Sequence, residues 1–320
     1  MHAVVLVGGF GTRLRPLTNS LPKPLLPLGQ RTILEWLLVH LARGGVTDAV
    51  LALGFKPEPF AQAYPDARCA GVRLAYAIED SPLDTAGAIG FAARSANLHE
   101  RGEAFVVANG DIVTDLAVAD LVAAHRANVS RGARATIHLT PVADPSQYGV
   151  VEFTEAGGRV RGFLEKPAAG TTTSRHVNAG TYVFEPDVLD LLPGDAPQSV
   201  ERVTFPALAA HGALFAHPTD DYWLDAGRPE SYLRANLDLV GGRRRDRDAA
   251  VHDSARVAND AVVRDSVVGA RAVIEPGASV VGSVVFPGAR IGAGARVSGS
   301  SVMGDVAASS TVRDALVGRD

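Results

Sequence analysis

Short hydrophobic runs alternate with helical patterns over the first 240 residues of the chain. β-Branched and aliphatic residues form runs at 3–7, 49–53, 72–77, 104–108 and 133–140, each with the length of a strand. The clearest helical pattern covers Thr32–Arg43, where apolar side chains keep an i, i+3, i+4 spacing until Gly44–Gly45. This order predicts an α/β fold with a Rossmann-like, doubly wound mixed sheet over residues 1–240.

A different pattern begins after a charged, glycine-containing segment at 241–248, which we interpret as a solvated linker. Beyond it, aliphatic residues recur at nearly every sixth position, with Gly, Ala, Ser and Asp between them. This period predicts a left-handed parallel β-helix of hexapeptide repeats over residues 249–320, with three hexads in a coil and about four coils. The positions expected to face its interior are Val251, Val257, Val263, Val268, Ile274, Val280, Phe286, Ile291, Val297 and Met303.

Composition and charge narrow the possible partners. The chain has 320 residues, of which 47% are hydrophobic and 21% charged, so it can bury a core. A net charge of −4 without long blocks of one sign argues against nucleic acid or an anionic membrane as a partner. The single cysteine, Cys69, excludes an internal disulfide, and the first apolar run is too short for a signal sequence or a membrane span. We therefore expect a cytoplasmic protein.

A glycine-rich segment after the first predicted strand carries the strongest chemical signal. Gly8, Gly9 and Gly11 have no Cβ atom, so the N–H groups of this loop can approach phosphate oxygens closely. Arg13 and Lys23 add positive charge, and lysine is otherwise rare in this chain. Two familiar phosphate-binding patterns do not fit: a leucine replaces the third glycine of a dinucleotide-binding loop, and no Gly-Lys-Ser/Thr of a Walker motif follows.

This segment resembles the signature of the sugar-1-phosphate nucleotidyltransferases. The sequence Leu-Val-Gly-Gly-Phe-Gly-Thr-Arg-Leu-Arg-Pro-Leu-Thr from Leu6 to Thr18, followed by Lys23-Pro24, is most similar to that of mannose-1-phosphate guanylyltransferases, which also carry a hexapeptide-repeat tail. Further motifs of the family follow at matching intervals over nearly the whole chain: Asp84-Thr-Ala-Gly87, Asn109-Gly-Asp111, Glu165-Lys166-Pro167, Asn178-Ala-Gly180 and Asp221-Tyr-Trp-Leu-Asp225.

The resemblance implies a role for each motif. The implied nucleotide-binding residues are Leu6, Gly8, Gly9, Gly11, Thr12, Arg13, Lys23, Asp84, Gly87 and Asn109. The implied sugar-phosphate-binding residues are Tyr148, Gly149, Glu165, Lys166, Asn178 and Gly180. Arg13, Lys23, Asp111 and Asp225 are the implied catalytic residues, and the two aspartates are the implied ligands of Mg²⁺.

Several of these residues also have a purely structural interpretation. Asp111 follows an apolar strand, so its carboxylate is expected at the sheet edge where open α/β sheets bind ligands, but it could be an ordinary turn aspartate. Asp225 could instead cap a helix that begins near Arg228-Pro229. Asp84 could accept hydrogen bonds from guanine or cap the helix that begins near Thr85.

The resemblance implies nucleotidyl transfer, in which a phosphate oxygen of a sugar 1-phosphate attacks the α-phosphorus of a nucleoside triphosphate and pyrophosphate leaves. Such a reaction depends on positioning and on charge neutralisation by Arg, Lys and a metal ion. GTP and mannose 1-phosphate are the expected substrates. Three alternatives remain: UTP, ATP or dTTP with glucose 1-phosphate; GTP with another sugar or cyclitol phosphate; and a catalytically silent regulatory homologue. Of these nucleotides, dTTP is disfavoured by Lys23-Pro24.

The repeat region suggests two further functions. Acyltransferases with hexapeptide repeats need a catalytic histidine on the β-helix, and this region has only His252, at its very beginning, which argues against that activity. Stacked coils end in open strand edges, so we expect a homo-oligomer assembled through the β-helix.

Overall fold

The computed structural model describes residues 1–9, 11–54, 57–155, 157–168 and 170–319. The chain divides into two compact units. The first comprises Met1–Gly8 and Leu37–Trp223, and the second comprises Gly9–Trp36 and Leu224–Asp320. Most of the glycine-rich signature is therefore grouped with the C-terminal part of the chain. The linear division at residues 240 and 249 stays a prediction.

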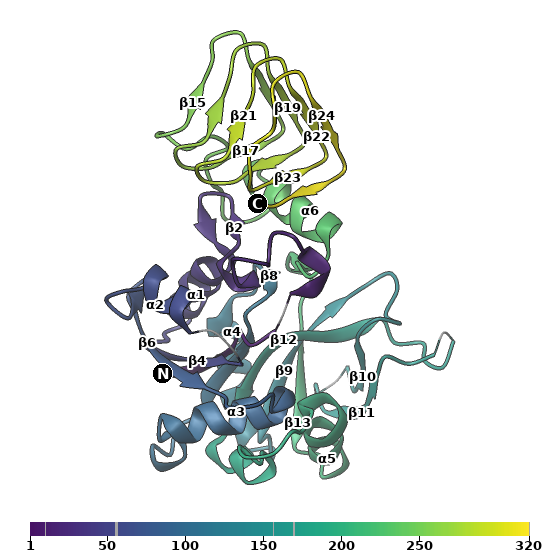
Figure 1. The fold of residues 1–320 in the computed structure, drawn as a ribbon. Coiled ribbons are helices and arrows are strands. Elements are labelled where there is room, and N and C mark those ends of the chain that lie inside the picture. The colour runs from purple at the N-terminus through teal and green to yellow at the C-terminus, as the bar shows by residue number, and fades with distance from the viewer. Residues whose placement is uncertain (10, 55–56, 156, 169, 320) are drawn as a thin grey trace. The chain divides into compact units, whose positions relative to one another are not determined.

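The first unit contains a mixed sheet (Figure 1). Its strands are β1 (His2–Leu6), β4 (Asp48–Leu53), β5 (Arg68–Cys69), β6 (Val72–Ile78), β7 (Phe105–Asn109), β9 (Ala135–Pro141), β10 (Gly149–Phe153), β11 (Val160–Glu165), β12 (His176–Phe184) and β13 (Leu214–Pro218). They lie in the order β11-β10-β12-β7-β1-β4-β6-β5, and β9 pairs with β12 and β13. β7, β1, β4 and β6 are parallel, whereas β12 is antiparallel to β7 and β9. The five strands expected from the hydrophobic runs are confirmed.

Helices cover both faces of this sheet, which confirms the doubly wound fold. On one face, α3 (Asp84–Ser95) and α5 (Phe205–Ala210) contribute to a buried cluster that also contains Ala135 and Ile137 of β9. Thr136 lies between those two residues and points to the opposite face, because side chains alternate along a strand. There, Thr136 Oγ1 is 2.9 Å from Nδ1 of His125 in α4 (Val118–Val129).

The predicted helix over Thr32–Arg43 is confirmed as α1 (Ile33–Arg43). Its start is a reciprocal cap, because Glu35 N donates to Thr32 Oγ1 (3.1 Å) and Thr32 N donates to Glu35 Oε2 (2.6 Å). α2 (Glu58–Ala63), the 3₁₀ turns at Leu98–Glu100 (η3) and Pro186–Leu191 (η4), and a π-helical turn at Val200–Thr204 (η5) complete the helices of the first unit. Among the described residues, no helix is both long and apolar enough to cross a membrane.

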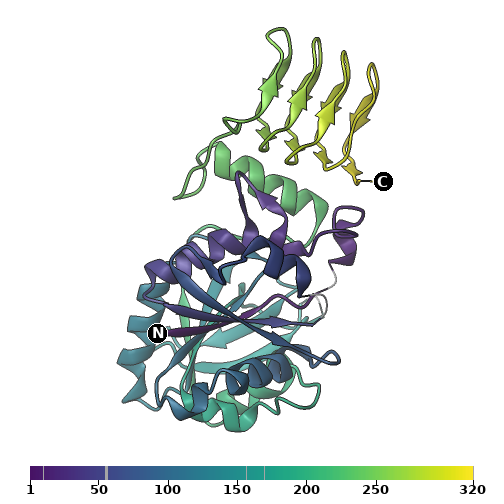
Figure 2. The ribbon, with the colours of Figure 1, turned by 60° about the vertical axis from the view of Figure 1, so that its left-hand side comes forward.

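The C-terminal part of the second unit is a parallel β-helix, as expected (Figure 2). Its strands are β15 (Arg256–Val257), β16 (Val262–Arg264), β17 (Val267–Val268), β18 (Val273–Ile274), β19 (Ser279–Val281), β20 (Val284–Val285), β21 (Arg290–Ile291), β22 (Arg296–Ser298), β23 (Ser301–Val302), β24 (Thr311–Arg313) and β25 (Leu316–Val317). In the described part of the chain they form the parallel sheets β15-β18-β21, β16-β19-β22-β24 and β17-β20-β23-β25. Each sheet is one face of the helix.

The expected register of this helix is wrong on one face. Val285 and Val302, rather than Phe286 and Met303, belong to the buried interior cluster. The reason is the coil length: Val267 pairs with Val284, and Val284 with Ser301, so the early coils advance by 17 residues rather than 18. In these coils, one of the three spacings between successive inward-facing residues is therefore five residues instead of six. The last coil is shorter still and advances by 15 residues, from Ser301 to Leu316.

Phe286 and Met303 are buried on the outside of the β-helix instead. The Phe286 ring lies 6.2 Å from the ring of Tyr232 in α6 (Pro229–Val240), and Met303 Sδ lies 3.8 Å from Ser20 Oγ. Their large side chains thus join the β-helix to other segments of the second unit.

A hairpin of β2 (Pro27–Leu28) and β3 (Arg31–Thr32) is anchored to α6 and to the β-helix. Gly29 N donates to Asn236 Oδ1 (2.8 Å), and the Gln30 side-chain amide donates to Ala249 O (2.9 Å). The segment at 241–248 also takes part, because Asp248 Oδ2 accepts from Gln30 N (2.8 Å) and Arg244 is buried. Arg244 and Asp248 thus anchor this segment, while Gly241, Arg243, Arg245 and Arg247 are exposed, and its function as a linker stays a prediction.

Candidate functional site

The glycine-rich segment forms a tight turn in the second unit. Gly11 has φ = 58° and precedes the 3₁₀ turn η1 (Thr12–Leu14), on which Thr12 and Arg13 are exposed. Its carbonyl accepts from Thr18 Oγ1 (2.8 Å). A Cβ atom at Gly11 would lie 3.0 Å from the Thr18 methyl carbon and 3.3 Å from Lys23 Cβ. Glycine is therefore required both by the backbone conformation and by the close approach of Lys23.

Arg13, Lys23 and Asp225 gather around Gly227 in the same unit; we call these three residues the charged cluster. Lys23, in the 3₁₀ turn η2 (Lys23–Leu25), is buried, and its Nζ lies 3.7 Å from Asp225 Oδ1. Gly227 N donates to the same oxygen (2.8 Å). A Cβ atom at Gly227 would lie 2.9 Å from Arg13 Nη2 and 3.1 Å from Lys23 Nζ. The sequence analysis missed Gly227, although its position two residues after Asp225 is a usable signal.

The charged cluster carries two cations and one carboxylate. Guanidinium and ammonium groups bind phosphate oxygens, so this cluster is suited to an anion such as a polyphosphate. Asp225 precedes the helix α6 but does not cap it: the residue before α6 is Arg228, and no side chain caps that end. The structural alternative for Asp225 is therefore wrong.

In the first unit, the Asn109–Asp111 turn follows β7 at the carboxyl edge of the sheet. Asn109 pairs with Leu6 across the parallel strands, and Gly110 N donates to Leu6 O (2.8 Å). A Cβ atom at Gly110 would lie 2.8 Å from that carbonyl oxygen, so the turn needs glycine to pack against β1. The buried Asn109 Oδ1 has no hydrogen-bond partner among the described residues, and Asp111 is half-buried. The turn thus lies at the sheet edge where this fold class binds ligands.

Asn178 and Gly180 lie beside this turn because β12 is irregular. The register between β12 and β9 shifts between Asn178 and Tyr182, and Gly180 has φ = 79°. A Cβ atom at Gly180 would lie 2.9 Å from Asn109 Nδ2. The Asn178 amide is oriented from both sides: Oδ1 accepts from Gly180 N (3.0 Å), and Nδ2 donates to Tyr182 OH (2.9 Å).

The expected sugar-phosphate residues at 148–149 and 165–166 are also brought together. Gly149 pairs with Glu165 across β10 and β11, and Lys166 N donates to Tyr148 O (3.0 Å). A Cβ atom at Gly149 would lie 2.6 Å from the Phe163 ring, which explains the glycine. The Lys166 side chain is largely exposed and its Nζ lies 3.5 Å from Glu165 Oε1.

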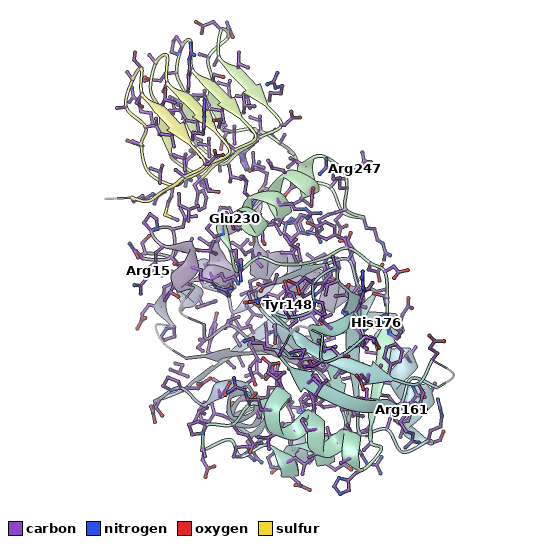
Figure 3. All side chains as sticks on the ribbon, turned by 90° about the vertical axis from the view of Figure 1, so that its right-hand side faces the viewer. Arg15, Tyr148, Arg161, His176, Glu230 and Arg247 are labelled. Atoms are coloured by element: carbon purple, nitrogen blue, oxygen red, sulfur yellow. The ribbon has the colours of Figure 1, made fainter. Side chains whose placement is uncertain are left out.

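Tyr148, which is labelled in Figure 3, is connected to the Asn178–Gly180 segment through Trp223. The Tyr148 and Trp223 rings meet edge to face with centroids 5.4 Å apart, and Trp223 Nε1 donates to Ala179 O (2.9 Å). Trp223 therefore joins two groups of expected sugar-phosphate residues and lies two positions before Asp225.

The expected nucleoside loop forms the start of α3. Asp84 is exposed, has φ = 56°, and its Oδ1 accepts from Thr85 N (2.7 Å). Gly87 is buried, and a Cβ atom there would lie 2.5 Å from Ala196 O. The amides of Ala86 and Gly87 donate to Gln198 O at 2.7 and 3.3 Å. The first turn of α3 is therefore satisfied by the segment near Gln198, and Gly87 has a packing function.

The remaining two glycines of the signature differ in their surroundings. A Cβ atom at Gly8 would lie 2.9 Å from Gly54 N, so Gly8 is required by the contact between the ends of β1 and β4. A Cβ atom at Gly9 would meet no described residue within 4 Å. Gly9 is thus an open position in the loop.

Burial dominates the electrostatics of two groups on the first unit. Burial raises the pKa of the Tyr182 hydroxyl well above its ordinary value, and the negative charges of Glu201, Glu165 and Asp111 raise it further. Burial also raises the pKa of Glu79, whose Oε2 accepts from Leu83 N (3.0 Å). Tyr182 thus stays a neutral hydroxyl beside Asn178.

Comparisons with known proteins agree with these observations. The model of the nucleotidyl transferase family matches residues 2–241. The mannose-1-phosphate guanylyltransferase of Mycobacterium tuberculosis is 38% identical over 304 residues, which are 92% of this chain and 82% of that protein. The probable mannose-1-phosphate guanylyltransferase 3 of Oryza sativa subsp. japonica is 36% identical over 318 residues, which are 94% and 86% of the two chains.

A solved structure gives the same fold. The crystal structure of HddC from Yersinia pseudotuberculosis superimposes with a TM-score of 0.60 at 26% sequence identity, and the match covers 73% of this chain and 97% of that chain. The signature turn brings Arg13 and Lys23 together, and the Asn109–Asp111 turn lies at the edge of the doubly wound sheet. Because the family model and relatives also match over most of the chain, the chain belongs to the nucleotidyl transferase family and, within it, to the mannose-1-phosphate guanylyltransferases.

Proposed function

We propose that the protein transfers GMP from GTP to mannose 1-phosphate, forming GDP-mannose and pyrophosphate. The observation that supports this most directly is the charged cluster, in which Gly227 leaves room for Arg13 Nη2 and Lys23 Nζ beside Asp225. A phosphate oxygen of the sugar 1-phosphate forms a bond to the α-phosphorus of GTP, and the bond to the bridging oxygen of the β-phosphate breaks in line. No protein nucleophile is required.

The site residues take complementary roles in this proposal. Arg13 binds the triphosphate and the leaving pyrophosphate, Lys23 neutralises charge near the α-phosphate, and the exposed Lys166 binds the sugar phosphate. Glu165 and Asn178 hydrogen-bond to sugar hydroxyl groups. The intramolecular bonds of Asn178 support this role, because they hold its amide in one orientation and leave one N–H available.

The donor atoms of this chain suit Mg²⁺, which we propose is bound by Asp111 and Asp225. Gly227 N and Lys23 engage Asp225 Oδ1, which leaves Oδ2 as an oxygen donor. Asn109 Oδ1, which has no partner in the part of the chain that the structure describes, lies two residues from Asp111. Within the described ranges, no group of three or more His, Cys, Asp or Glu side chains could hold a metal ion. The two carboxylates of Asp111 and Asp225 fit Mg²⁺, which takes one or two carboxylates together with phosphates and water. When bound, the ion neutralises charge on the phosphates.

We further propose that Asp84 recognises the base. Its carboxylate is exposed at the start of α3, and the Thr85 amide binds only one of its oxygens, so Oδ2 can accept hydrogen bonds from the N1–H and amino groups of guanine. We therefore propose that the site selects guanine over uracil and adenine. We also propose that the protein is cytoplasmic.

A homo-oligomer assembled through the β-helix is the last part of this proposal. Val251, Val257 and Val262 on the first coil are 37%, 36% and 52% exposed, and β15 and β16 are edge strands of their sheets. Such edges favour pairing with another chain. Light scattering of the intact protein tests this, and a monomer at micromolar concentration contradicts it.

A matrix of substrates tests the reaction itself. The purified protein with Mg²⁺ is offered GTP, dTTP, UTP, ATP or CTP with mannose 1-phosphate or glucose 1-phosphate, and pyrophosphate release is measured. We expect the highest kcat/KM for GTP with mannose 1-phosphate. A preference for another pair leaves the mechanism in place and contradicts the proposed substrates, whereas no release from any pair contradicts the proposed function.

A further inference from the structure

A half-buried carboxylate outside the motifs named above is hydrogen-bonded to the nucleoside loop. Glu201 is in the π-helical turn η5 (Val200–Thr204) of the first unit. Its Oε2 accepts hydrogen bonds from Thr85 Oγ1 (2.7 Å) and Ser199 Oγ (2.9 Å). Two short bonds from different segments fix the orientation of this side chain.

Thr85 is hydrogen-bonded to the segment that contains Glu201. Val200 N donates to Thr85 Oγ1 (2.8 Å), so the Thr85 hydroxyl is satisfied as donor and as acceptor. Gln198 N donates to Leu83 O (3.0 Å), directly before the nucleoside loop. A displacement of Glu201 would therefore be transmitted to the start of α3.

The second carboxylate oxygen of Glu201, Oε1, accepts no hydrogen bond from the described residues, although the side chain is half-buried. Oε1 is not among the fully buried side-chain atoms without a partner in the described residues, so it is accessible to solvent and a hydroxyl group of a bound ligand can reach it.

The turn that carries Glu201 packs near the expected sugar residues. Phe205 directly follows η5, and its ring lies 5.0 Å from the Tyr182 ring. β11, which ends at Glu165, also contacts η5. The Tyr182 hydroxyl accepts from Asn178 Nδ2 at 2.9 Å. Asn178 and the turn that carries Glu201 therefore both lie beside Tyr182, and β11 lies beside that turn.

We propose that Glu201 is a specificity-determining residue whose Oε1 accepts a hydrogen bond from a hydroxyl group of the sugar 1-phosphate, while Thr85 and Ser199 orient it through Oε2. The inference rests on the proposed function and adds a sugar contact to it. Because the same carboxylate is bonded to the nucleoside loop, it couples the position of that loop to the sugar.

Deoxy analogues of the sugar test this role. Wild-type protein and Glu201→Gln are compared with mannose 1-phosphate and with its 2-, 3-, 4- and 6-deoxy analogues at saturating GTP. The substitution is expected to lower kcat/KM for mannose 1-phosphate by about 10- to 100-fold, the range for a hydrogen bond to a charged group. One analogue, which lacks the contacted hydroxyl, should then react equally well with both proteins.

Matched variants separate this role from a structural one. Arg202→Gln changes the charge by one on the same turn at an exposed side chain and should leave all five sugars unaffected. If Glu201→Gln does not fold, Thr85→Val removes one orienting donor and should give the same pattern at a loss of about 3- to 10-fold.

Two results would overturn the proposal while wild-type turnover persists: unchanged kcat/KM in a folded Glu201→Gln protein, or an equal loss for every analogue. An inactive wild-type protein is a different result, because it removes the proposed function and this inference together.

Discussion

Lys23 Nζ lies 3.7 Å from Asp225 Oδ1, although the two residues are far apart along the chain. Both belong to the second compact unit, which combines the Gly9–Trp36 segment with the β-helix. The hairpin that follows Lys23 is bonded to α6 and to Ala249 at the start of the β-helix. The repeat region therefore supports the residues proposed to bind the triphosphate, in addition to any role in assembly.

The substitution Gly227→Ala is expected to lower kcat by about 100-fold with little effect on the thermal midpoint. The added Cβ would lie 2.8 Å from Asp225 Oδ1, 2.9 Å from Arg13 Nη2 and 3.1 Å from Lys23 Nζ. These are the ends of flexible side chains, so they can move aside, but a displacement of about 1 Å at a reacting centre costs on the order of 100-fold in rate. Steady-state kinetics and a thermal melt measure the two effects.

Gly162→Ala is a suitable control for this substitution, because the nearest atom to its Cβ would be Glu152 Oε2 at 3.7 Å. Normal turnover by Gly227→Ala would mean that the charged cluster does not contribute to the reaction.

Asp111→Asn and Asp225→Asn should each lower kcat by on the order of 100-fold or more while the fold is retained. Each change removes a negative charge that we propose for the Mg²⁺ site and keeps the size of the side chain. Pyrophosphate release as a function of Mg²⁺ concentration measures the effect, and the exposed Asp120→Asn in α4 provides the control. If the folded variants turn over normally at low Mg²⁺, the assignment of the metal ligands is wrong.

Stability should fall when the pH drops below about 6.5, in part because of His138. Burial lowers its pKa from 6.5 to about 3, and its Nδ1 has no hydrogen-bond partner among the described residues. Between these two pH values the unfolded chain binds a proton at this residue and the folded chain does not, so acid favours unfolding. The contribution is complete above pH 6.5 and is lost progressively down to about pH 3.

Denaturant titrations between pH 4 and pH 8 measure this effect. His138→Gln cannot titrate, so its free energy of unfolding should depend less on pH below 6.5 than that of the wild-type protein. Parallel curves for the two proteins over the whole range would contradict the prediction.

Ser283→Ala should destabilise the β-helix by about 1–3 kcal/mol. Ser283 belongs to a column of buried serines in which Ser283 N donates to Ser266 Oγ and Ser300 N donates to Ser283 Oγ, both at 3.1 Å. Removal of the hydroxyl leaves the buried Ser300 amide without an acceptor. Chemical denaturation followed by circular dichroism measures the loss, and Ser279→Ala, which lies on a strand of the same coil, should change stability by much less.

Most of the architecture was predictable because it follows from local periodicity. The runs that became β1, β4, β6, β7 and β9 have the alternation and length of strands, and the stop at Gly44–Gly45 ended α1 as expected. The β-helix was equally visible in its six-residue period. Its register was not, since Val285 and Phe286 are adjacent apolar residues, and only the 17-residue coil decides which of them faces inward.

The candidate site was predictable where it is continuous in sequence. The motifs at Gly8–Arg13, Asn109–Asp111 and Asn178–Gly180 were recognised because each contains glycines or polar residues directly after a strand. Gly227 and Glu201 were missed because their significance comes from contacts with distant segments. A single glycine or glutamate in a sequence gives no indication of such contacts.

The amino-acid sequence by itself thus determined the fold class, the repeat architecture and the reaction family, because periodicity and short motifs are properties of neighbouring residues. The tertiary structure alone decided that Gly9–Trp36 is grouped with the β-helix, that Lys23 meets Asp225, and that Glu201 is held by Thr85. These contacts join residues far apart along the chain. They depend on the packing of whole elements, which no local pattern specifies.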